Sequence, residues 1–343
     1  APPATNPHAS PTSKMSSLRP SPPTPSRSTP TGLPKGEGRL PLIVIVGPSA
    51  VGKTEISLQL AERLRGEIVS ADSRLFYRGL DIGTAKPTPA EQARVPHHLI
   101  DIADPHETWS LALFQQAAIQ AIADIHQRSR LPFLVGGTGQ YIRAVTHAWT
   151  PPAQAPHPRL RANLETLARE RSNAWLHSKL AVLDPLAAEI IDPRNLRRTI
   201  RALEVILSTG KRFSEQRGRS ESPYRLLTLG LKRPRPELYA RLDARIQAMF
   251  ANGLLDEVQR LLDRGYSPDL PSLSAIGYRE CVMVLQGKLT QEQARQAIQR
   301  ATRVFVRRQA NWFKQDDPTI HWFDAGQTPM NEMVAYIMTR IAE

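Results

Sequence analysis

The sequence predicts an α/β fold in which a parallel β-sheet, flanked by helices, is interrupted by an all-α insertion. Across residues 42–148, short apolar runs alternate with amphipathic helical patterns, as expected for parallel strands joined by crossover helices. A proline-rich stretch at 150–158 ends this alternation, and helical patterns alone follow up to about residue 219. A strand-like run at 224–231 then returns the chain to the sheet.

The first apolar run, residues 42–46, leads into GPSAVGKT at 47–54, which fits the phosphate-loop pattern GxxxxGK[ST]. Ile56, Leu60 and Leu64 recur every four residues and predict a helix directly after it. In this context the backbone N–H groups of the turn face a diphosphate, Lys53 neutralises it, and the Thr54 hydroxyl holds Mg²⁺. The core is therefore predicted to be P-loop NTPase-like, with a diphosphate bound by Gly47, Pro48, Ser49, Ala50, Val51, Gly52, Lys53 and Thr54. The motif does not specify a nucleotide.

Two later strands supply further candidates. The run at 67–71 is followed by Asp72, whereas the run at 131–135 ends in a glycine-rich turn that contains Thr138 and no acid. An NTPase needs an acid after such a strand to hold the metal, so its absence argues against ordinary ATP hydrolysis. Because residues beyond the carboxyl ends of parallel strands line the ligand crevice, we expect Lys53, Asp72 and Thr138 to converge there. Asp72 is equally well explained as a helix cap or turn former.

The remaining elements define four segments. Helices are expected at 158–171, 174–183 and 193–209, then two helices at 237–264 that are split near Asn252, and a last strand at 319–323. The predicted segments are a disordered tail at 1–38, the first part of the core at 39–149, a helical insertion at 150–222, and the second part of the core with the C-terminal helices at 223–343.

Charge and cysteine content restrict the partners and the compartment. The formal net charge of the 343 residues is +13, and residues 1–36 carry only +4 of it, so the rest is basic and suits a polyanion such as a nucleic acid. The single Cys281 excludes an internal disulfide and a thiolate zinc cluster, and we expect it to be a small core residue. No apolar run approaches the roughly 20 residues that span a bilayer. We expect a cytoplasmic protein with no membrane partner.

The tail is rich in Pro, Ser and Thr and is expected to have no function. Its acid-poor composition is also typical of an organelle transit peptide, although it shows no amphipathic helix and has many prolines. Met15 is an equally good start of the chain.

Two predicted helices carry basic stripes. On the helix at 194–207, an apolar face opposes an arginine face; the residues are Leu196, Ile200, Leu203 and Leu207 against Arg194, Arg197, Arg198 and Arg201. The long helix from Gln291 repeats this pattern, with Ala294, Ile298, Ala301 and Phe305 against Arg300, Arg303, Arg307 and Lys314. One stripe is usually a solvated face, but two in a basic chain favour binding to a phosphate backbone.

The motifs together resemble the tRNA dimethylallyltransferases, also called tRNA isopentenyltransferases, of the bacterial type. The matching segments occur in family order: GPSAVGKT (47–54), SADSRLFY (70–77), DIGTAKP (81–87), PHHLID (96–101), VGGTGQY (135–141), IRALEV (200–205), SAIGYRE (274–280) and RRQANWFK (307–314). The resemblance covers residues 42–323. Ser49 stands where Thr is also common, which removes no chemical group that the reaction requires.

The resemblance implies transfer of a dimethylallyl group from dimethylallyl diphosphate to N6 of adenosine 37, beside the tRNA anticodon, with release of diphosphate. Asp72 would accept the N6 proton, Thr138 would donate a hydrogen bond near the reacting centre, and Arg245 would join Lys53 and Mg²⁺ in stabilising the diphosphate. The target base would have to be flipped out of the anticodon loop.

The resemblance also implies which residues contact the tRNA anticodon stem-loop: Asp72, Ser73, Arg74, Leu75 and Thr138; Arg161 in the insertion; Arg197, Arg198, Thr199, Ile200 and Arg201; and Ser274, Ala275, Ile276, Gly277, Tyr278 and Arg279. The helix of Arg197 to Arg201 is the one that the charge pattern indicated independently. The role of His97 stays open between a structural hydrogen bond and a place near the crevice.

Three other functions explain the sequence less well than a tRNA dimethylallyltransferase. A small-metabolite kinase gives no purpose to the helical insertion or the basic stripes, and an enzyme that prenylates free AMP should lack the insertion and the long C-terminal helix. A noncatalytic RNA-binding module would not need Lys53, Thr54 and Asp72 together. We expect a monomeric enzyme; the sequence does not indicate which tRNAs it modifies.

Overall fold

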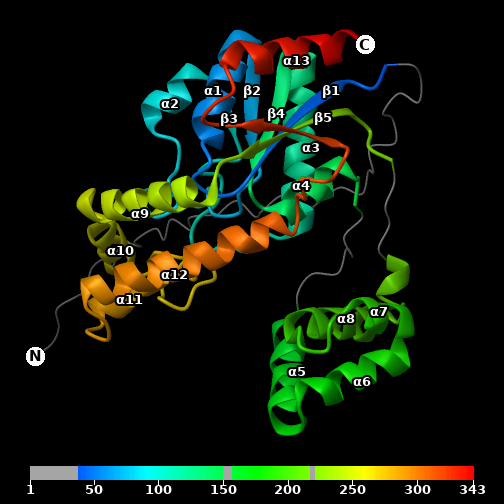
Figure 1. Ribbon diagram of the computed structural model, residues 1–343. Helices are drawn as coiled ribbons and strands as arrows, with labels where there is room; N and C mark the ends of the chain where they lie inside the picture. The colour runs from blue at the N-terminus through cyan, green and yellow to red at the C-terminus, as the bar shows by residue number, and fades with distance from the viewer. Residues whose placement is uncertain (1–37, 150–156, 217–220) are drawn as a thin grey trace, which may run out of the picture. The chain divides into compact units, whose positions relative to one another are not determined.

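The computed structural model describes residues 38–149, 157–216 and 221–343 (Figure 1). The predicted tail therefore lies outside the described residues, except for Gly38. In the part that is described, six strands form one parallel sheet in the order β3-β2-β4-β1-β5-β6. The strands are β1 Pro41–Val46, β2 Gly66–Ser70, β3 His97–His98, β4 Leu131–Gly136, β5 Arg225–Lys232 and β6 Ile320–Asp324. The predicted parallel sheet is confirmed, although the two-residue β3 is too short to leave a pattern in the sequence.

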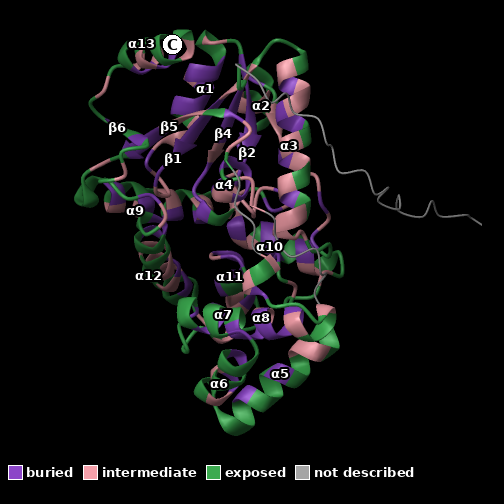
Figure 2. Cartoon of the chain, turned by 90° about the vertical axis from the view of Figure 1, so that its right-hand side faces the viewer, coloured by how far each residue is buried: buried purple, intermediate pink, exposed green. Residues whose placement is uncertain are grey.

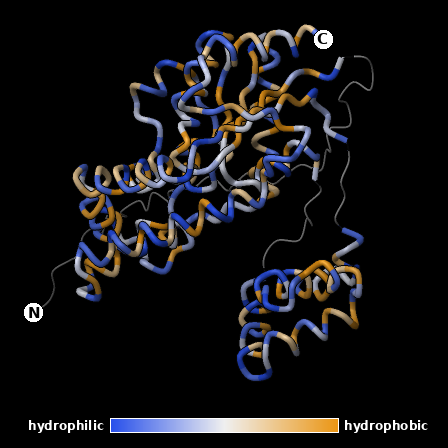
Figure 3. Tube along the Cα trace, viewed as in Figure 1, coloured by the Kyte–Doolittle hydropathy of each residue, from blue (hydrophilic) through white to orange (hydrophobic). Residues whose placement is uncertain are grey.

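Helices cover both faces of the sheet, which explains the unbroken apolar run of β1. Leu42, Val44 and Val46 face one hydrophobic cluster, and Ile43 and Ile45 face the other. The first cluster includes residues of α3 (Leu111–Gln127), and the second includes α1 (Lys53–Arg63) and α13 (Met330–Ala342). Nearly every residue of β1 and β2 is buried, and these strands are accordingly largely purple in Figure 2. Figure 3 shows the apolar residues of the sheet in orange. Each fully buried aliphatic side chain contributes about 1.5–3 kcal/mol.

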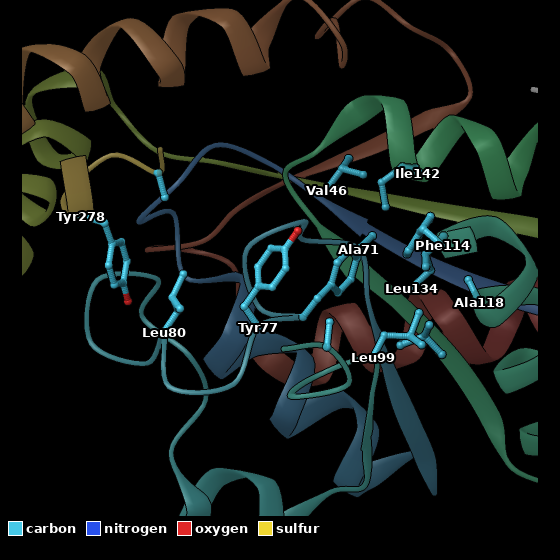
Figure 4. Packing of buried hydrophobic residues seen from close by; sticks show 14 of the residues in the cluster. Val46, Ala71, Tyr77, Leu80, Leu99, Phe114, Ala118, Leu134, Ile142 and Tyr278 are labelled. Carbon is cyan, nitrogen blue, oxygen red and sulfur yellow. The ribbon is translucent and has the colours of Figure 1, made fainter. Parts of the chain in front are cut away.

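The first cluster continues from the sheet to the loops at the carboxyl ends of the strands. Figure 4 shows Val46, Ala71 and Leu134 near the sheet, and Tyr77 and Tyr278 farther along the same cluster. The remaining helices of this part of the chain are α2 Pro89–Arg94, α4 Gly139–Thr146, α9 Arg235–Ala251, α10 Leu254–Asp263, α11 Tyr278–Leu285 and α12 Gln291–Ala310. Cys281 is fully buried on α11, as predicted. Within these described ranges, no helix is long and apolar enough to cross a membrane.

The chain between β4 and β5 forms helices with a hydrophobic cluster of their own. These are α5 Pro158–Arg171, α6 Asn173–Leu183, α7 Pro185–Ile190 and α8 Leu196–Thr209, followed by a short 3₁₀ turn at Ser214–Gln216. Each helix begins at a residue whose side chain accepts a hydrogen bond from a backbone N–H of the first turn: His157, Ser172, Asp184 and Asn195. The sequence predicted three helices and missed α7, which has only six residues.

Candidate active site

A cavity of about 470 Å³ lies at the carboxyl ends of the strands. The first turn of α1 contributes Lys53 and Thr54 to its lining, and the loop after β2 contributes Asp72. The last residue of β4, Gly136, also lines the cavity, and α9 adds Arg245. Parallel strands deliver these side chains to one edge of the sheet, which is where α/β proteins bind ligands.

The phosphate loop adopts a conformation that depends on glycine. Gly47 has a φ of 151°, and a Cβ there would lie 2.7 Å from the carbonyl oxygen of Leu231. Gly52 has a φ of 113° and precedes the first turn of α1. Lys53 Nζ donates to the carbonyl oxygens of Gly47, at 3.0 Å, and Pro48, at 2.9 Å, so the ammonium is held at the mouth of its own loop.

Two arginines that the sequence analysis did not select hold this loop from outside. Arg241 Nε on α9 donates to the carbonyl oxygen of Ala50 at 2.9 Å, and Arg233 Nε donates to that of Val51 at 2.8 Å. Arg241 also lines the cavity. Its spacing of four residues from Arg245 on a helix was the signal that could have identified it.

The site is electropositive, and the side chains of Lys53, Asp72 and Arg245 that line it are each half-buried. Burial lowers the pKa of Lys53 to about 8 from an ordinary 10.5; the charge of Asp72 opposes this shift, and that of Arg245 adds to it. Burial also lowers the pKa of Arg245, against the attraction of Asp72. One carboxylate thus interacts with two cations, and the cation excess suits a dianionic or trianionic ligand.

Three carboxylates line the cavity. Of these, Asp72 is the one whose charge acts on the pKa of both Lys53 and Arg245. Glu91 accepts hydrogen bonds from Thr88 in the capping box of α2. Glu55 is exposed, accepts from Gln59, and lies 3.8 Å from Arg94. Asp72 Oδ1 accepts from the N–H of Arg74 at 2.9 Å, so the turn-forming explanation of this residue holds, while its carboxylate also lines the cavity.

Thr138 is not among the residues that line this cavity, whereas Gly136 of the same loop is. The chain turns into α4 directly after Thr138, which occupies the N-cap position without a capping hydrogen bond from its side chain.

His97 and His98 form β3. A ring nitrogen of His97 lies 2.7 Å from the carbonyl oxygen of Val95, and one of His98 lies 2.7 Å from Glu67 Oε2. These contacts support structural roles for both.

The structure brings two of the predicted tRNA-binding segments together. Arg74 Nη1 donates to the carbonyl oxygen of Pro271 at 2.8 Å and to that of Ser272 at 3.4 Å, which links the loop after β2 to the residues before α11. In the latter segment Ser274 and Arg279 are exposed and Ile276 is half-buried, whereas Ala275, Gly277 and Tyr278 are buried. Ser73 and Leu75, like Asp72 and Arg74, are half-buried.

On α8, two of the five predicted tRNA-binding residues are exposed to solvent. Arg197 and Arg198 are exposed, whereas Thr199 and Ile200 are buried. Arg201 Nη1 donates to the buried Glu204 at 2.6 Å. Arg161 on α5 binds the same carboxylate through two hydrogen bonds, of 2.8 and 2.9 Å.

The predicted apolar faces of the two basic helices need correction. Leu207 on α8 is 56% exposed, whereas Leu203 and Val205 are buried in the hydrophobic cluster of these helices. On α12, Phe305 is 41% exposed and Val306 and Gln309 are buried in its place.

The basic face of α12 also differs from the prediction. Arg303 donates to Asp243 Oδ2 on α9 at 2.6 Å and stacks over Tyr239, so it is not part of a solvated stripe. Lys314 lies beyond the end of α12. Arg300, Arg307 and Arg308 remain exposed.

The donors near the phosphate loop can be tested against the predicted Mg²⁺. Within residues 38–149, 157–216 and 221–343, no group of three or more His, Cys, Asp or Glu side chains could hold a metal ion. Thr54 and Asp72 do place oxygen donors in one cavity. This fits Mg²⁺, which takes oxygen ligands and often binds through one or two protein oxygens together with substrate phosphates.

Comparison with known proteins agrees with the resemblance in the sequence. A model of the family described as IPP transferase matches residues 75–316. A tRNA dimethylallyltransferase of Roseiflexus sp. (strain RS-1) is 54% identical over 299 residues, which cover 87% of this chain and 98% of the relative. A tRNA dimethylallyltransferase of Carboxydothermus hydrogenoformans is 44% identical over 301 residues, 87% of this chain and 96% of the relative.

Solved structures show the same fold. The full-length tRNA isopentenylpyrophosphate transferase of Bacillus halodurans is 43% identical, with a TM-score of 0.65 over 89% of this chain and 96% of that one. A eukaryotic dimethylallyltransferase acting on tRNA is 27% identical, with a TM-score of 0.75 over 88% of this chain and 80% of that one. The chain therefore belongs to the IPP transferase family.

Proposed function

We infer that the chain transfers a dimethylallyl group from dimethylallyl diphosphate to N6 of adenosine 37 in tRNA and releases diphosphate. The observation that carries this inference is the shared cavity, in which the phosphate loop and Arg245 face the carboxylate of Asp72. A diphosphate and a proton acceptor are thereby brought together, as transfer to an amino group requires.

The cations of the cavity hold the donor. Lys53 and the N–H groups of the loop neutralise the diphosphate, and Arg245 approaches it from α9. When bound at Thr54, Mg²⁺ would neutralise further charge on the diphosphate oxygens. Because Lys53 and Arg245 are partly buried, their charges act more strongly than they would in open solution.

Asp72 acts on the acceptor. The lone pair of N6 is delocalised into the adenine ring, which makes this amino group a poor nucleophile. N6 forms a bond to the terminal allylic carbon, the carbon–oxygen bond to the diphosphate breaks and its electron pair leaves with the diphosphate, and the N6 proton passes to the carboxylate. We assign Thr138 a hydrogen bond to the flipped adenosine, which would approach from the side of the glycine-rich loop.

The tRNA contacts are proposed on two surfaces. Arg74, Ser274 and Arg279 lie beside the loop of Asp72, and we propose that they hold the anticodon loop. Arg197 and Arg198 of residues 150–222, which we propose to be a tRNA-binding domain, would contact phosphates of the stem. We further propose that the enzyme acts as a monomer in the cytoplasm, where its tRNA substrate is.

The test is incubation of the full chain with radiolabelled dimethylallyl diphosphate and either unmodified tRNA or AMP, with a parallel incubation that contains ATP. Label in tRNA but not in AMP is expected. Label in AMP alone would indicate a free-nucleotide prenyltransferase, and ATP consumption without transfer would indicate a kinase.

A further inference from the structure

We propose that Gln309 on α12 is a positioning residue that fixes the phosphate loop against the glycine-rich loop after β4. Its side chain is buried and makes three hydrogen bonds. Oε1 accepts from Ser49 N at 2.9 Å and from Ser49 Oγ at 3.2 Å, and Nε2 donates to the carbonyl oxygen of Gly137 at 3.2 Å. The proposal adds a positioning residue to the reaction inferred above. Only its expected effect on prenyl transfer rests on the proposed function.

The orientation of this amide follows from its partners. A backbone N–H can only donate and a carbonyl oxygen can only accept, so Oε1 must face Ser49 and Nε2 must face Gly137. Space is limited as well, because a Cβ at residue 137 would lie 2.2 Å from Nε2. A glycine at 137 and an amide at 309 therefore depend on each other.

The arrangement affects the ligand site because both loops line the cavity, through Ser49 and Gly136. The N–H of Ser49 is bound to Gln309, so the diphosphate must be met by other N–H groups of the loop and by Lys53. Gln309 sets the spacing between the loop that holds the leaving group and the loop that carries Thr138. It also explains the hydroxyl at residue 49, which a Thr would supply equally well.

The experiment measures binding of inorganic pyrophosphate to the full chain by calorimetry, together with tRNA binding and steady-state transfer. Gln309→Met keeps the length of the side chain and removes all three hydrogen bonds, so pyrophosphate affinity should fall by about tenfold or more. The affinity for tRNA should stay within about twofold of wild type, because the general fold is kept. Gln296→Ala, at an exposed glutamine of the same helix, is the matched control and should resemble wild type.

The pair Ser49→Ala and Ser49→Thr tests the hydrogen bond between Ser49 and Gln309 without changing a residue of α12. Ser49→Ala should weaken pyrophosphate binding by about threefold, and Ser49→Thr should restore it. In the Gln309→Met background, Ser49→Ala should have no further effect if the hydroxyl acts through Gln309.

Several results would overturn the proposal: pyrophosphate affinity of Gln309→Met within twofold of wild type, an additive effect of Ser49→Ala in that background, or a parallel loss of tRNA and pyrophosphate binding. The pyrophosphate affinities of the variants can be interpreted even if the wild-type chain transfers no prenyl group. Failure of the proposed function and failure of this proposal are therefore distinguishable.

Discussion

Replacing Glu204 by glutamine should locally unfold the helices between β4 and β5. The Glu204 carboxylate is fully buried and accepts two hydrogen bonds from Arg161, one from Arg201 and one from the N–H of His157. Burial favours the neutral acid, but hydrogen bonds from Arg161, His157 and Arg201 outweigh it and hold the pKa at about 2. One pKa unit corresponds to about 1.4 kcal/mol, so the depression from 4.5 contributes about 3 kcal/mol of stability.

The lowered pKa of Glu204 also makes the stability of these helices depend on pH. A carboxylate whose pKa is depressed on folding contributes its full stability above the unfolded value near 4.5, and this contribution is lost as the pH falls toward 2. The helices of the wild type should therefore loosen as the pH falls below 4.5, and Glu204→Gln should lack this contribution already at pH 7.

Amide hydrogen exchange across α8 measures this directly. A loss of about 3 kcal/mol should speed exchange of its amides by roughly a hundredfold, if they exchange through local opening. Affinity for tRNA should fall with it, because Arg161 and Arg201 lose their common anchor. Glu165→Gln, at an exposed position of α5, is the control. Exchange within threefold of wild type in Glu204→Gln would show that the ion pairs of Glu204 do not stabilise α8.

Three further outcomes concern the cavity and the basic surface. Asp72→Asn should slow single-turnover transfer by about 10²–10⁴ with tRNA binding unchanged; a rate within threefold of wild type removes it as the proton acceptor. Pyrophosphate affinity should fall as the pH rises through about 8, where Lys53 loses its proton, and Lys53→Ala should abolish that dependence; a flat wild-type profile contradicts this. Replacing Arg197 and Arg198 by Ala should raise the KM for tRNA and reduce the log–log salt slope by roughly 0.9 per lost duplex phosphate contact; an unchanged slope means that the face is merely solvated.

The strand–loop–helix unit of β1 and α1 could be predicted because its signals are local. A buried parallel strand is apolar throughout, the turn requires glycines at fixed spacing, and the helix shows a four-residue period. The same locality placed Asp72 at the carboxyl end of its strand, in the cavity that Lys53 lines, whereas Thr138, which was expected to converge with them, is not among the lining residues.

The contacts that hold the loops could not be predicted because they join distant parts of the chain. Gln309 and Ser49 are 260 residues apart, and Arg233 and Val51 are 182 apart. On α12 the helical period indicated Phe305 as a core residue, but the partner changes along the helix. The helix packs on α9 and α11, and Gln309 near its end meets the two loops of the cavity, so Val306 and Gln309 are buried there and Phe305 is exposed.

Transfer of the dimethylallyl group to adenosine 37 is tested by following the diphosphate and the tRNA together in one reaction. The wild-type chain is incubated with dimethylallyl diphosphate and either an unmodified tRNA transcript or one with guanosine at position 37, without ATP. Released diphosphate is counted, and the tRNA is digested to nucleosides for mass spectrometry. We predict one dimethylallyl group on N6 of adenosine for each diphosphate released, and none with guanosine at 37. Diphosphate release without a modified adenosine, or equal modification of both transcripts, would contradict the account.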